Sequence, residues 1–296
     1  MLKRLPIVCF ALLALAACSH DSNSPAPAAS APSSSAGAPV QAPAAATPDP
    51  AAAGTAAAGS TAAPSSAPAA TSTAASTAPT TSADVPAFVE DPKWVEGKNY
   101  FRIEPAQPKV SNTDKVEVTE VFSYACPSCN NFHPMVAKLA ASLPSYAQMS
   151  YLPVSFIPQE NFPMFQRAYL TAQALGVAEK ANDAMYDAVW KNKELSSERA
   201  DGQGLKPMSD LPKIEDAAKV YAKFGVDPKE FVAVANSFSI NTQAKRSDEL
   251  VKAYGVEGTP TIVIDGKYRF DGRSAGGYPQ MVELARYLAA KEAAGK

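Results

Sequence analysis

The motif Cys126-Pro127-Ser128-Cys129 constrains this chain more than any other feature, because it stands between a strand pattern and a helix pattern. The preceding residues 115–124 (KVEVTEVFSY) are rich in β-branched and aromatic side chains, which predicts a buried strand. Apolar residues then recur at helical spacing from Phe132 to Leu143. Pro127 suits the first turn of a helix, where the N–H that it lacks is not needed. The sequence therefore predicts that both cysteines lie at a strand-to-helix junction.

This position predicts different chemistry for the two thiols. Unpaired N–H groups and the positive end of the helix dipole stabilise an anion at a helix N-terminus. In a Cys-x-x-Cys motif such a site lowers a thiol pKa from about 8.5 to between roughly 3.5 and 7.5. We expect Cys126, at the exposed start of the turn, to be the nucleophile and Cys129, further in, to be the resolving thiol. A stabilised thiolate favours the reduced form, so the disulfide should act as an oxidant.

Other uses of a cysteine pair fit less well. Apart from two cysteines in residues 1–18, the chain has no further cysteine. Tetrahedral zinc needs four ligands, and Cys126, Cys129 and His133 supply at most three, so we expect no metal. Covalent haem needs a histidine directly after the second cysteine, where Asn130 stands. A structural disulfide stays open, although so small a loop removes little entropy from the unfolded chain.

The N-terminus predicts export. Lys3 and Arg4 precede the apolar run Leu5 to Ala17, which is the order of a secretory signal and is too short to cross a bilayer. The run ends at Leu15-Ala16-Ala17-Cys18, which resembles the lipobox of bacterial lipoproteins, in which the cysteine is acylated. We expect residues 1–18 to be a lipoprotein-type signal peptide with lipid attached at Cys18. An ordinary signal peptide with a chance cysteine is the alternative.

A low-complexity segment follows. In residues 24–83, 57 of 60 positions are Ala, Pro, Ser, Thr or Gly, so no burial can offset the backbone entropy. We expect residues 19–84 to be a disordered linker that acts as a passive spacer, with a root-mean-square span of about 45 Å. Residues 85–296 are long enough for one sizeable core. Their 26 acidic and 25 basic residues nearly cancel, which gives no footprint for nucleic acid or anionic lipid.

The rest of the chain predicts a helical insertion. A second strand is expected at Met149 to Phe156 and the next at Thr261 to Ile264, with about 100 residues of helical patterns between them. A parallel crossover needs only one helix, so we expect a helical subdomain at about residues 157–255. Asp265-Gly266 predicts a tight hairpin turn into a further strand at Tyr268 to Phe270.

These motifs together resemble the thioredoxin superfamily and, more narrowly, the DsbA family of periplasmic dithiol oxidases. The resemblance covers about residues 96 to 292, with residues 96–100 as an entering strand. It implies an α/β thioredoxin fold with an inserted α-helical subdomain. In the family the first motif cysteine, here Cys126, forms a mixed disulfide with the substrate. A cis-proline loop, here Thr259 and Pro260, holds the substrate strand, and its free backbone suits pairing with an extended peptide.

The resemblance also implies partners and departures from the family pattern. Reduced exported proteins would be the substrates, a DsbB-type quinone-linked membrane oxidase would reoxidise the pair, and no cofactor beyond the disulfide would be needed. The family's buried acid matches Glu120, for proton transfer to Cys129, with a satisfied structural acid as the alternative. Ser128 stands where the archetype has histidine, so together with Pro127 it would tune a milder oxidant. Tyr151 replaces the lysine that often partners the buried acid.

The sequence thus predicts a monomeric, lipid-anchored protein-disulfide oxidoreductase of the bacterial periplasm. By resemblance to enterobacterial sorting, Ser19 after the lipidated cysteine favours the outer membrane. Two alternatives remain: a reductase or isomerase on the same fold, and a non-enzymatic peptide-binding lipoprotein adaptor. Isomerases of the superfamily dimerise through a folded N-terminal domain, which residues 24–83 cannot form. Membrane-bound reductases carry Trp before the first cysteine, where Ala125 stands.

Overall fold

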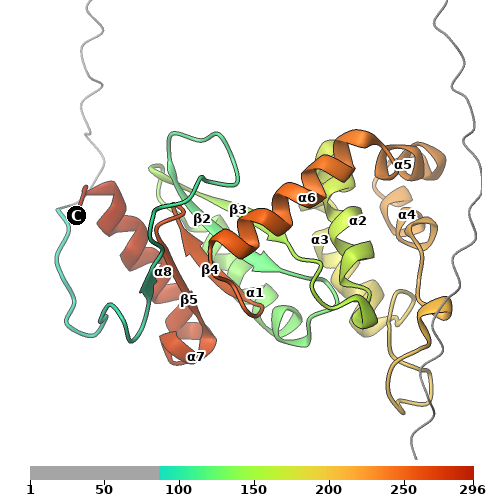
Figure 1. The fold of residues 1–296 in the computed structure, drawn as a ribbon, viewed down its shortest axis with the longest axis horizontal. Helices are drawn as coiled ribbons and strands as arrows, with labels where there is room; N and C mark the ends of the chain where they lie inside the picture. Colours follow the sequence, from blue (N-terminus) through green and yellow to red (C-terminus); the bar gives the residue numbers. More distant parts are fainter. Residues whose placement is uncertain (1–86) are drawn as a thin grey trace, which may run out of the picture. The chain divides into compact units, whose positions relative to one another are not determined.

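The computed structural model describes residues 87–296, so the expected signal peptide, Cys18 and the linker at residues 19–84 lie outside the described range. A five-stranded sheet with the order β1-β5-β4-β2-β3 forms the centre of the described part (Figure 1). Strands β2 and β3 are parallel, and the other neighbours are antiparallel. The strands are β1 (Phe101–Arg102), β2 (Val116–Phe122), β3 (Ala147–Pro153), β4 (Thr261–Ile264) and β5 (Tyr268–Asp271).

The helices are divided between the two sides of the molecule. Helix α8 lies at one side of the sheet in Figure 1, and α2 to α6 form a group at the other side. No helix within residues 87–296 is both long and apolar enough to span a bilayer. The helices are α1 (Pro127–Ala141), α2 (Phe162–Ala174), α3 (Ala178–Tyr186), α4 (Ile214–Ala222), α5 (Pro228–Ala235), α6 (Phe238–Ala253), α7 (Gly272–Ala275) and α8 (Tyr278–Ala293).

Each face of the sheet carries its own apolar core. On one face, Val118 and Ile262 pack with side chains of α1 and α8. On the other face, Val121 and Val263 belong to the larger core, which the helical group completes. Because successive side chains of a strand point to opposite faces, Ile262 and Ile264 of β4 belong to one core and Val263 between them belongs to the other.

The helical insertion is confirmed. Helices α2 to α6 all lie between β3 and β4 in the chain, as the spacing of the two strand patterns predicts. The start of α5 shows why the sequence folds this way locally. Asp227 caps this helix by accepting hydrogen bonds from the backbone N–H groups of Lys229 and Glu230, both at 2.9 Å, and Pro228 occupies the first helical position.

The expected entering strand at residues 96–100 is wrong. These residues form a tight turn, in which the backbone N–H of Gly97 donates to the carbonyl of Tyr100 at 2.8 Å. Gly97 has a φ of 80°, which favours glycine, and the Asn99 side chain accepts a hydrogen bond from the Val95 N–H. The strand β1 begins only after this turn and pairs with β5. The turn chemistry of glycine and asparagine outweighed the strand pattern.

The hairpin between β4 and β5 forms as predicted. Asp265 and Gly266 have φ values of 53° and 66°, as a turn with two left-handed residues requires. A Cβ atom at Gly266 would lie 2.0 Å from the Gln107 carbonyl oxygen, so the loop before β2 approaches this turn closely. The turn therefore needs glycine both for its backbone conformation and for space.

Candidate active site

Cys126 caps the helix that follows it. Strand β2 ends at Phe122 and α1 begins at Pro127, so the cysteine pair lies at the predicted junction. The Sγ atom of Cys126 accepts a hydrogen bond from the backbone N–H of Cys129 at 3.4 Å, in the way that a serine or aspartate side chain caps a helix. The first turn of α1 contains no acidic residue that would oppose a negative charge on this sulfur.

The surroundings of Cys126 favour its thiolate. The pKa of Cys126 is lowered to about 6, chiefly by a hydrogen bond with the Cys129 side chain and also by Thr259 and the backbone N–H groups of Cys129 and Ser128, whereas burial opposes the shift. Only 6 % of Cys126 is exposed. The expectation of an exposed nucleophile is therefore wrong, because the loop at Thr259 lies against this sulfur.

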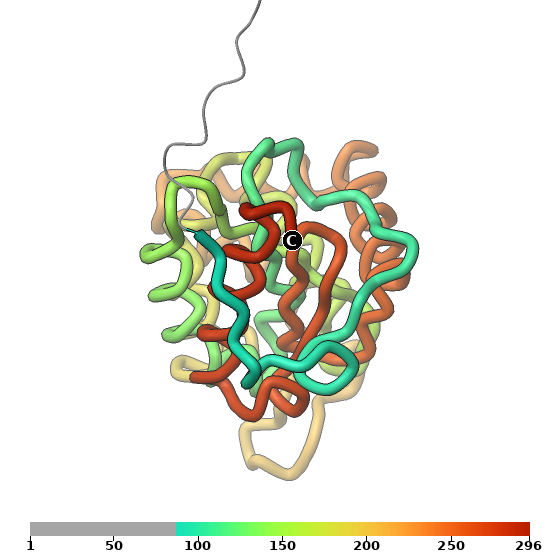
Figure 2. Tube along the Cα trace, turned by 90° about the vertical axis from the view of Figure 1, so that its left-hand side faces the viewer, coloured from blue at the N-terminus to red at the C-terminus, as the bar shows by residue number. Residues whose placement is uncertain are grey.

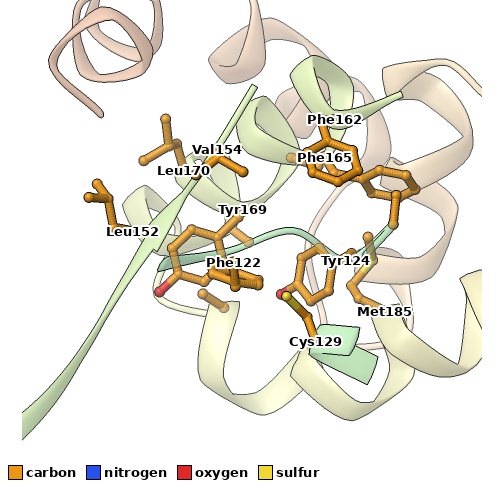
Figure 3. Packing of buried hydrophobic residues seen from close by; sticks show 14 of the residues in the cluster. Phe122, Tyr124, Cys129, Leu152, Val154, Phe162, Phe165, Tyr169, Leu170 and Met185 are labelled. Atoms are coloured by element: carbon orange, nitrogen blue, oxygen red, sulfur yellow. The ribbon is translucent and has the colours of Figure 1, made fainter. Parts of the chain in front are cut away.

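Cys129 has the opposite character. It is fully buried, and burial together with the adjacent Cys126 raises its pKa well above the usual value. Figure 3 shows Cys129 beside Tyr124 in the aromatic part of the larger core. Both cysteines are free thiols in the structure, so it represents the dithiol form. The Cys126 sulfur is thus stabilised as a thiolate, whereas the Cys129 sulfur favours its protonated form.

The loop before β4 has the expected cis-proline. The Thr259–Pro260 peptide bond is cis, and the Thr259 carbonyl oxygen lies 3.3 Å from the Sγ atom of Cys126, which donates to it. Pairing of β4 with β2 begins at Thr261, opposite Val121, so the backbone of Thr259 lies outside the sheet. A peptide that reaches Cys126 would meet this backbone segment first.

A cavity of about 370 Å³ adjoins the motif, and most of its wall comes from residues outside the motifs recognised in the sequence. Its lining includes Ser128, Thr259, Pro260, Gly272, Arg273 and Tyr278. The short helix α7, which contributes Gly272 and Arg273, had no prediction. The sequence feature that could have indicated a special backbone after α7 is the pair Gly276-Gly277 before Tyr278. Gly277 has a φ of 129°, and a Cβ atom there would lie 2.8 Å from the Gln280 side chain.

Glu120 lies fully buried in β2, opposite Tyr151 of β3. Its Oε1 atom has no hydrogen-bond partner within residues 87–296. Burial, and secondarily the charge of Cys126, raises the pKa of Glu120 to about 8. The charge of Glu120 in turn raises the pKa of Cys129. The alternative of a satisfied structural acid does not describe this residue.

Glu117, rather than Glu120, is the buried acid with a structural role, and no motif in the sequence points to it. Glu117 is also fully buried, but its carboxylate accepts hydrogen bonds from the backbone N–H groups of Val110 at 2.7 Å and Ser111 at 2.8 Å. The hydroxyl groups of Ser111, Thr119 and Ser150 donate to it as well. Glu117 therefore fixes the loop before β2, whereas the Oε1 atom of Glu120 has no hydrogen-bond partner among the described residues.

His133 binds a carboxylate of the helical insertion. Its Nε2 atom lies 2.7 Å from an Asp183 oxygen in α3, and its ring stacks on Tyr186 with 4.3 Å between the ring centres. Nearby, the Trp190 indole N–H donates to the Tyr124 carbonyl at 2.8 Å. These contacts join the helical insertion to the segment that carries the cysteines.

Comparison with known proteins places this geometry in a known class. The family model described as DSBA-like thioredoxin domain matches residues 117–288. The chain is 34 % identical over 202 residues to the thiol:disulfide interchange protein DsbA of Pseudomonas aeruginosa, which covers 68 % of this chain and 87 % of that protein. The crystal structure of P. aeruginosa DsbA has a TM-score of 0.57 at 32 % identity, with 68 % of this chain and 96 % of that chain covered. Oxidoreductase DsbA from Xylella fastidiosa gives 0.58 at 27 % identity, covering 67 % and 98 %.

Proposed function

The chain belongs to the family of DSBA-like thioredoxin domains and is a thiol:disulfide oxidoreductase, and we propose that it donates a Cys126–Cys129 disulfide to reduced exported proteins. The single observation that carries the direction of electron flow is the lowered pKa of Cys126 at the start of α1. A stabilised thiolate favours the dithiol form of the enzyme, so its disulfide readily oxidises other thiols.

The reaction transfers one disulfide in two exchange steps. A substrate thiolate attacks the Cys126 sulfur, the Cys126–Cys129 bond breaks, and Cys129 leaves with the electron pair. A second substrate thiolate then attacks the substrate sulfur of the mixed disulfide and releases the Cys126 thiolate. The substrate gains a disulfide and the enzyme gains two electrons. Thr259 and Pro260 support this exchange because their backbone lies beside Cys126 and outside the sheet, where an extended substrate segment would bind.

Glu120 is proposed to supply the proton that Cys129 needs when it leaves. A carboxyl group with a pKa of about 8 is largely protonated at neutral pH, and the raised pKa of Cys129 makes this thiolate a strong proton acceptor. In the oxidative return, when Cys129 must lose its proton, the same carboxyl group would accept it. Pro127 and Ser128 tune the pair without adding charge, since neither side chain carries one.

The DsbA family works in the bacterial periplasm, and we propose that this chain works there from a lipid anchor at Cys18. The tetrapeptide that ends at Cys18 and the low-complexity residues 19–84 support an anchored domain on a spacer, with the outer membrane favoured by Ser19. A DsbB-type quinone-linked oxidase would restore the disulfide. No cofactor beyond the cysteine pair is required by this scheme.

Two measurements test the oxidase function. In a Cys129→Ser variant, the Cys126 thiolate can still attack a disulfide of an exported protein and release one substrate thiolate, but no thiol at position 129 can attack the resulting mixed disulfide, so covalent complexes that disappear on reduction should accumulate. Cys126→Ser should form none. Equilibration of the wild-type pair with glutathione should give a reduction potential well above the roughly −270 mV typical of thioredoxin. A potential near that value would point to the reductase instead, and the absence of trapped complexes would favour the adaptor.

The anchor has its own test. Cys18→Ser should move the protein from the membrane fraction to the soluble periplasmic fraction and leave oxidation of a soluble thiol peptide unchanged. Labelling with a radioactive fatty acid should mark the wild type alone. If Cys18→Ser stayed in the membrane fraction, the lipid anchor would be wrong while the oxidase function would stand.

A further inference from the structure

The cavity beside the cysteine motif carries charges that the exchange chemistry described above does not use. One part of its wall is formed by Ser128 of the motif with Thr259 and Pro260, and α7 contributes Arg273 to another part. Asp271, the last residue of β5, lines the cavity as well. Within residues 87–296 neither of the two charged side chains forms an ion pair, with each other or with any other residue.

The carboxylate of Asp271 is already compensated by hydrogen bonds. It caps α7 by accepting a hydrogen bond from the Ser274 backbone N–H at 2.8 Å, and the Ser274 hydroxyl accepts one from the Asp271 N–H at 3.1 Å. The Arg273 side chain is exposed, and no hydrogen bond from the described part of the chain holds its guanidinium group. The uncompensated charge in the cavity wall is therefore positive.

Other side chains of the wall add hydrogen-bond donors. Ser128 and Tyr278 line the cavity, and neither hydroxyl group has a hydrogen-bond partner among residues 87–296. Three further lining residues are the glycines Gly258, Gly272 and Gly277, so much of the wall is backbone and leaves room for a ligand. Guanidinium and hydroxyl donors around an open space suit a carboxylate, because an ionised carboxylate only accepts hydrogen bonds.

The cavity lies close to the reactive sulfur. The carbonyl oxygen of Thr259, which lines the cavity, is 3.3 Å from the Sγ atom of Cys126, and Ser128 follows Cys126 by two positions. A substrate segment that is bonded to Cys126 and runs along the Thr259 backbone therefore passes the mouth of the cavity. An extended chain advances about 3.3 Å per residue, so the side chains next to the substrate cysteine are the ones that reach the cavity.

The helical insertion contributes nothing to this cavity. None of the lining residues belongs to residues 157–255. In Figure 1, α7 and α8 lie on one side of the sheet, and the group of α2 to α6 lies on the other side. Figure 2 views the molecule from the side of α8, where the C-terminal segments (red) lie in front. Charged residues of the insertion are therefore suitable controls for the charge of Arg273.

We propose that Arg273 makes the enzyme select substrate segments that carry an acidic side chain next to the cysteine that bonds to Cys126. The inference rests on the proposed function and concerns its substrate class: reduced exported proteins with Asp or Glu beside a cysteine. The exchange steps stay as given above, and Arg273 binds the carboxylate of the segment that takes part in them. Because the wall is open to water and salt, the selectivity should be modest.

The test is a competition for Cys126 in the full chain carrying Cys129→Ser. The peptide acetyl-Gly-Asp-Cys-Asp-Gly-amide and its Asn counterpart each form a mixed disulfide with Cys126, and mass spectrometry measures the exchange equilibrium between the two complexes. We expect this equilibrium to favour the Asp peptide about fivefold more in the protein with Arg273 than in R273Q at low ionic strength. R273E should disfavour the Asp peptide and favour a Lys counterpart. Comparing variants cancels the different thiol acidity of the peptides.

Arg246 offers a matched control, because it is an exposed arginine of α6 that does not line the cavity. R246E changes the net charge as R273E does, and we expect it to leave the preference unaltered. D271N removes the negative charge of the cavity wall but keeps a side chain that can cap α7, so it should raise the preference for the Asp peptide. In about 0.5 M NaCl the preference should fall below about twofold, because salt screens an exposed ion pair.

The selection by Arg273 is overturned if R273Q shows the same preference as the protein with Arg273, if R246E changes the preference as much as R273E, or if D271N lowers it. These outcomes leave the oxidase function standing, since exchange at Cys126 still occurs. A preference that depends on Arg273, in a protein whose cysteine pair has the reduction potential of a thioredoxin, would keep the selection and overturn the proposed direction of transfer. A protein that forms no mixed disulfide with either peptide would overturn both.

Discussion

Cys126 differs from an ordinary helix-capping residue because its side chain can carry the charge that the cap stabilises. The Cys129 thiol and the N–H groups of the first turn all donate toward one sulfur, and together they outweigh a burial that alone would raise the pKa. The neighbouring position 128 is occupied by a neutral serine. The oxidising strength of this pair therefore depends on hydrogen bonds and backbone dipoles rather than on a charged neighbour.

Ser128→His should strengthen the oxidant. An imidazolium beside the Cys126 thiolate should lower the thiol pKa by about one unit, which corresponds to about 1.4 kcal/mol. The same stabilisation raises the reduction potential of the pair by about 30 mV. Thiolate absorbance at 240 nm against pH gives the first quantity, and equilibration with glutathione gives the second. Ser128→Asn is the uncharged control, and an equal shift in both variants would contradict the electrostatic explanation.

Glu120 should make the protein less stable as pH rises. Its pKa is about 4.5 in an unfolded chain and about 8 in the folded one, so the folded state binds more protons between these values. The free energy of unfolding should therefore fall by up to about 1.4 kcal/mol per pH unit across this window. Urea unfolding of the wild type at pH 5 and pH 8 measures the slope.

Glu120→Gln is the matched variant for this prediction, because an amide keeps the size and polarity of the side chain but does not titrate. We expect its stability to change much less between pH 5 and pH 8 than that of the wild type. If the two proteins showed the same slope, another group would be responsible. The variant should also slow formation of the mixed disulfide, the step in which Cys129 leaves, and single-turnover measurements with a thiol peptide would detect this.

At the residue scale, short sequence patterns predict which residues react, but they do not predict how these residues are buried or hydrogen-bonded. The junction around Cys126 and the cis peptide at Pro260 could be predicted because each follows from a short local pattern. The burial of Cys126 could not, since it depends on a loop 133 residues away in the chain. Nor could the lack of a hydrogen-bond partner for Glu120 Oε1 within residues 87–296, which depends on the side chains that neighbouring strands and helices place around it.

At the scale of elements, Glu117 shows how one side chain can hold a loop in place. It receives donors from the loop before β2, from β2 itself and from β3, and its own backbone N–H donates to an Asp265 side-chain oxygen in the turn between β4 and β5 at 3.0 Å. The same loop accepts a hydrogen bond from the Tyr254 hydroxyl at 2.6 Å, at the Pro108 carbonyl. Three parts of the fold therefore meet at this carboxylate.

Glu117→Gln should lower the free energy of unfolding by about 3 kcal/mol. The amide NH₂ group would face donors instead of accepting from them, which leaves buried polar groups unpaired at a cost of about 1 to 3 kcal/mol each. Urea unfolding should show a lower midpoint with an unchanged m value. Ser150→Ala removes a single donor and should cost about 1 kcal/mol. A loss no greater in Glu117→Gln than in Ser150→Ala would contradict this account.

Elements with strong periodicity or turn chemistry could be predicted, and short elements could not. The helices of the insertion and the Asp265-Gly266 turn follow from patterns that extend over several residues or require a special backbone. The strand β1 has two residues and was placed too early, over the turn at Gly97. The helix α7 has four residues, too few to show a period. Such elements depend on tertiary packing rather than on their own sequence.

At the scale of the whole molecule, contacts between the thioredoxin part and the helical insertion converge behind the cysteine pair. His133 binds Asp183, Tyr186 packs against Tyr124 at 5.0 Å between ring centres, and Trp190 donates to the backbone there. The length of the insertion could be predicted from the distance between two strand patterns. Its orientation could not, because these contacts join residues about 50 to 70 positions apart whose pairing no local pattern indicates.

The redox state should set the pH dependence of stability for the whole molecule. In the dithiol form the Cys126 pKa is about 6, against about 9 in the unfolded chain, so the unfolded state binds more protons between these values. The contribution of Cys126 to the stability of the reduced protein is therefore absent below pH 6 and rises by up to about 1.4 kcal/mol per pH unit to pH 9. The disulfide form has no thiol proton to lose, so it lacks this pH-dependent contribution to its stability.

As pH rises, the free energy of unfolding of the reduced protein should therefore increase relative to that of the oxidised protein. Glu120 lowers stability with rising pH in both forms, so its effect largely cancels in the comparison. Urea unfolding of both forms at pH 5.5, 7 and 8.5 measures the difference. Cys126→Ser, which has no thiol at this position, should show none of the increase. A difference between the two wild-type forms that stays constant with pH would mean that Cys126 ionises like a free thiol, and the proposed direction of disulfide transfer would lose its physical basis.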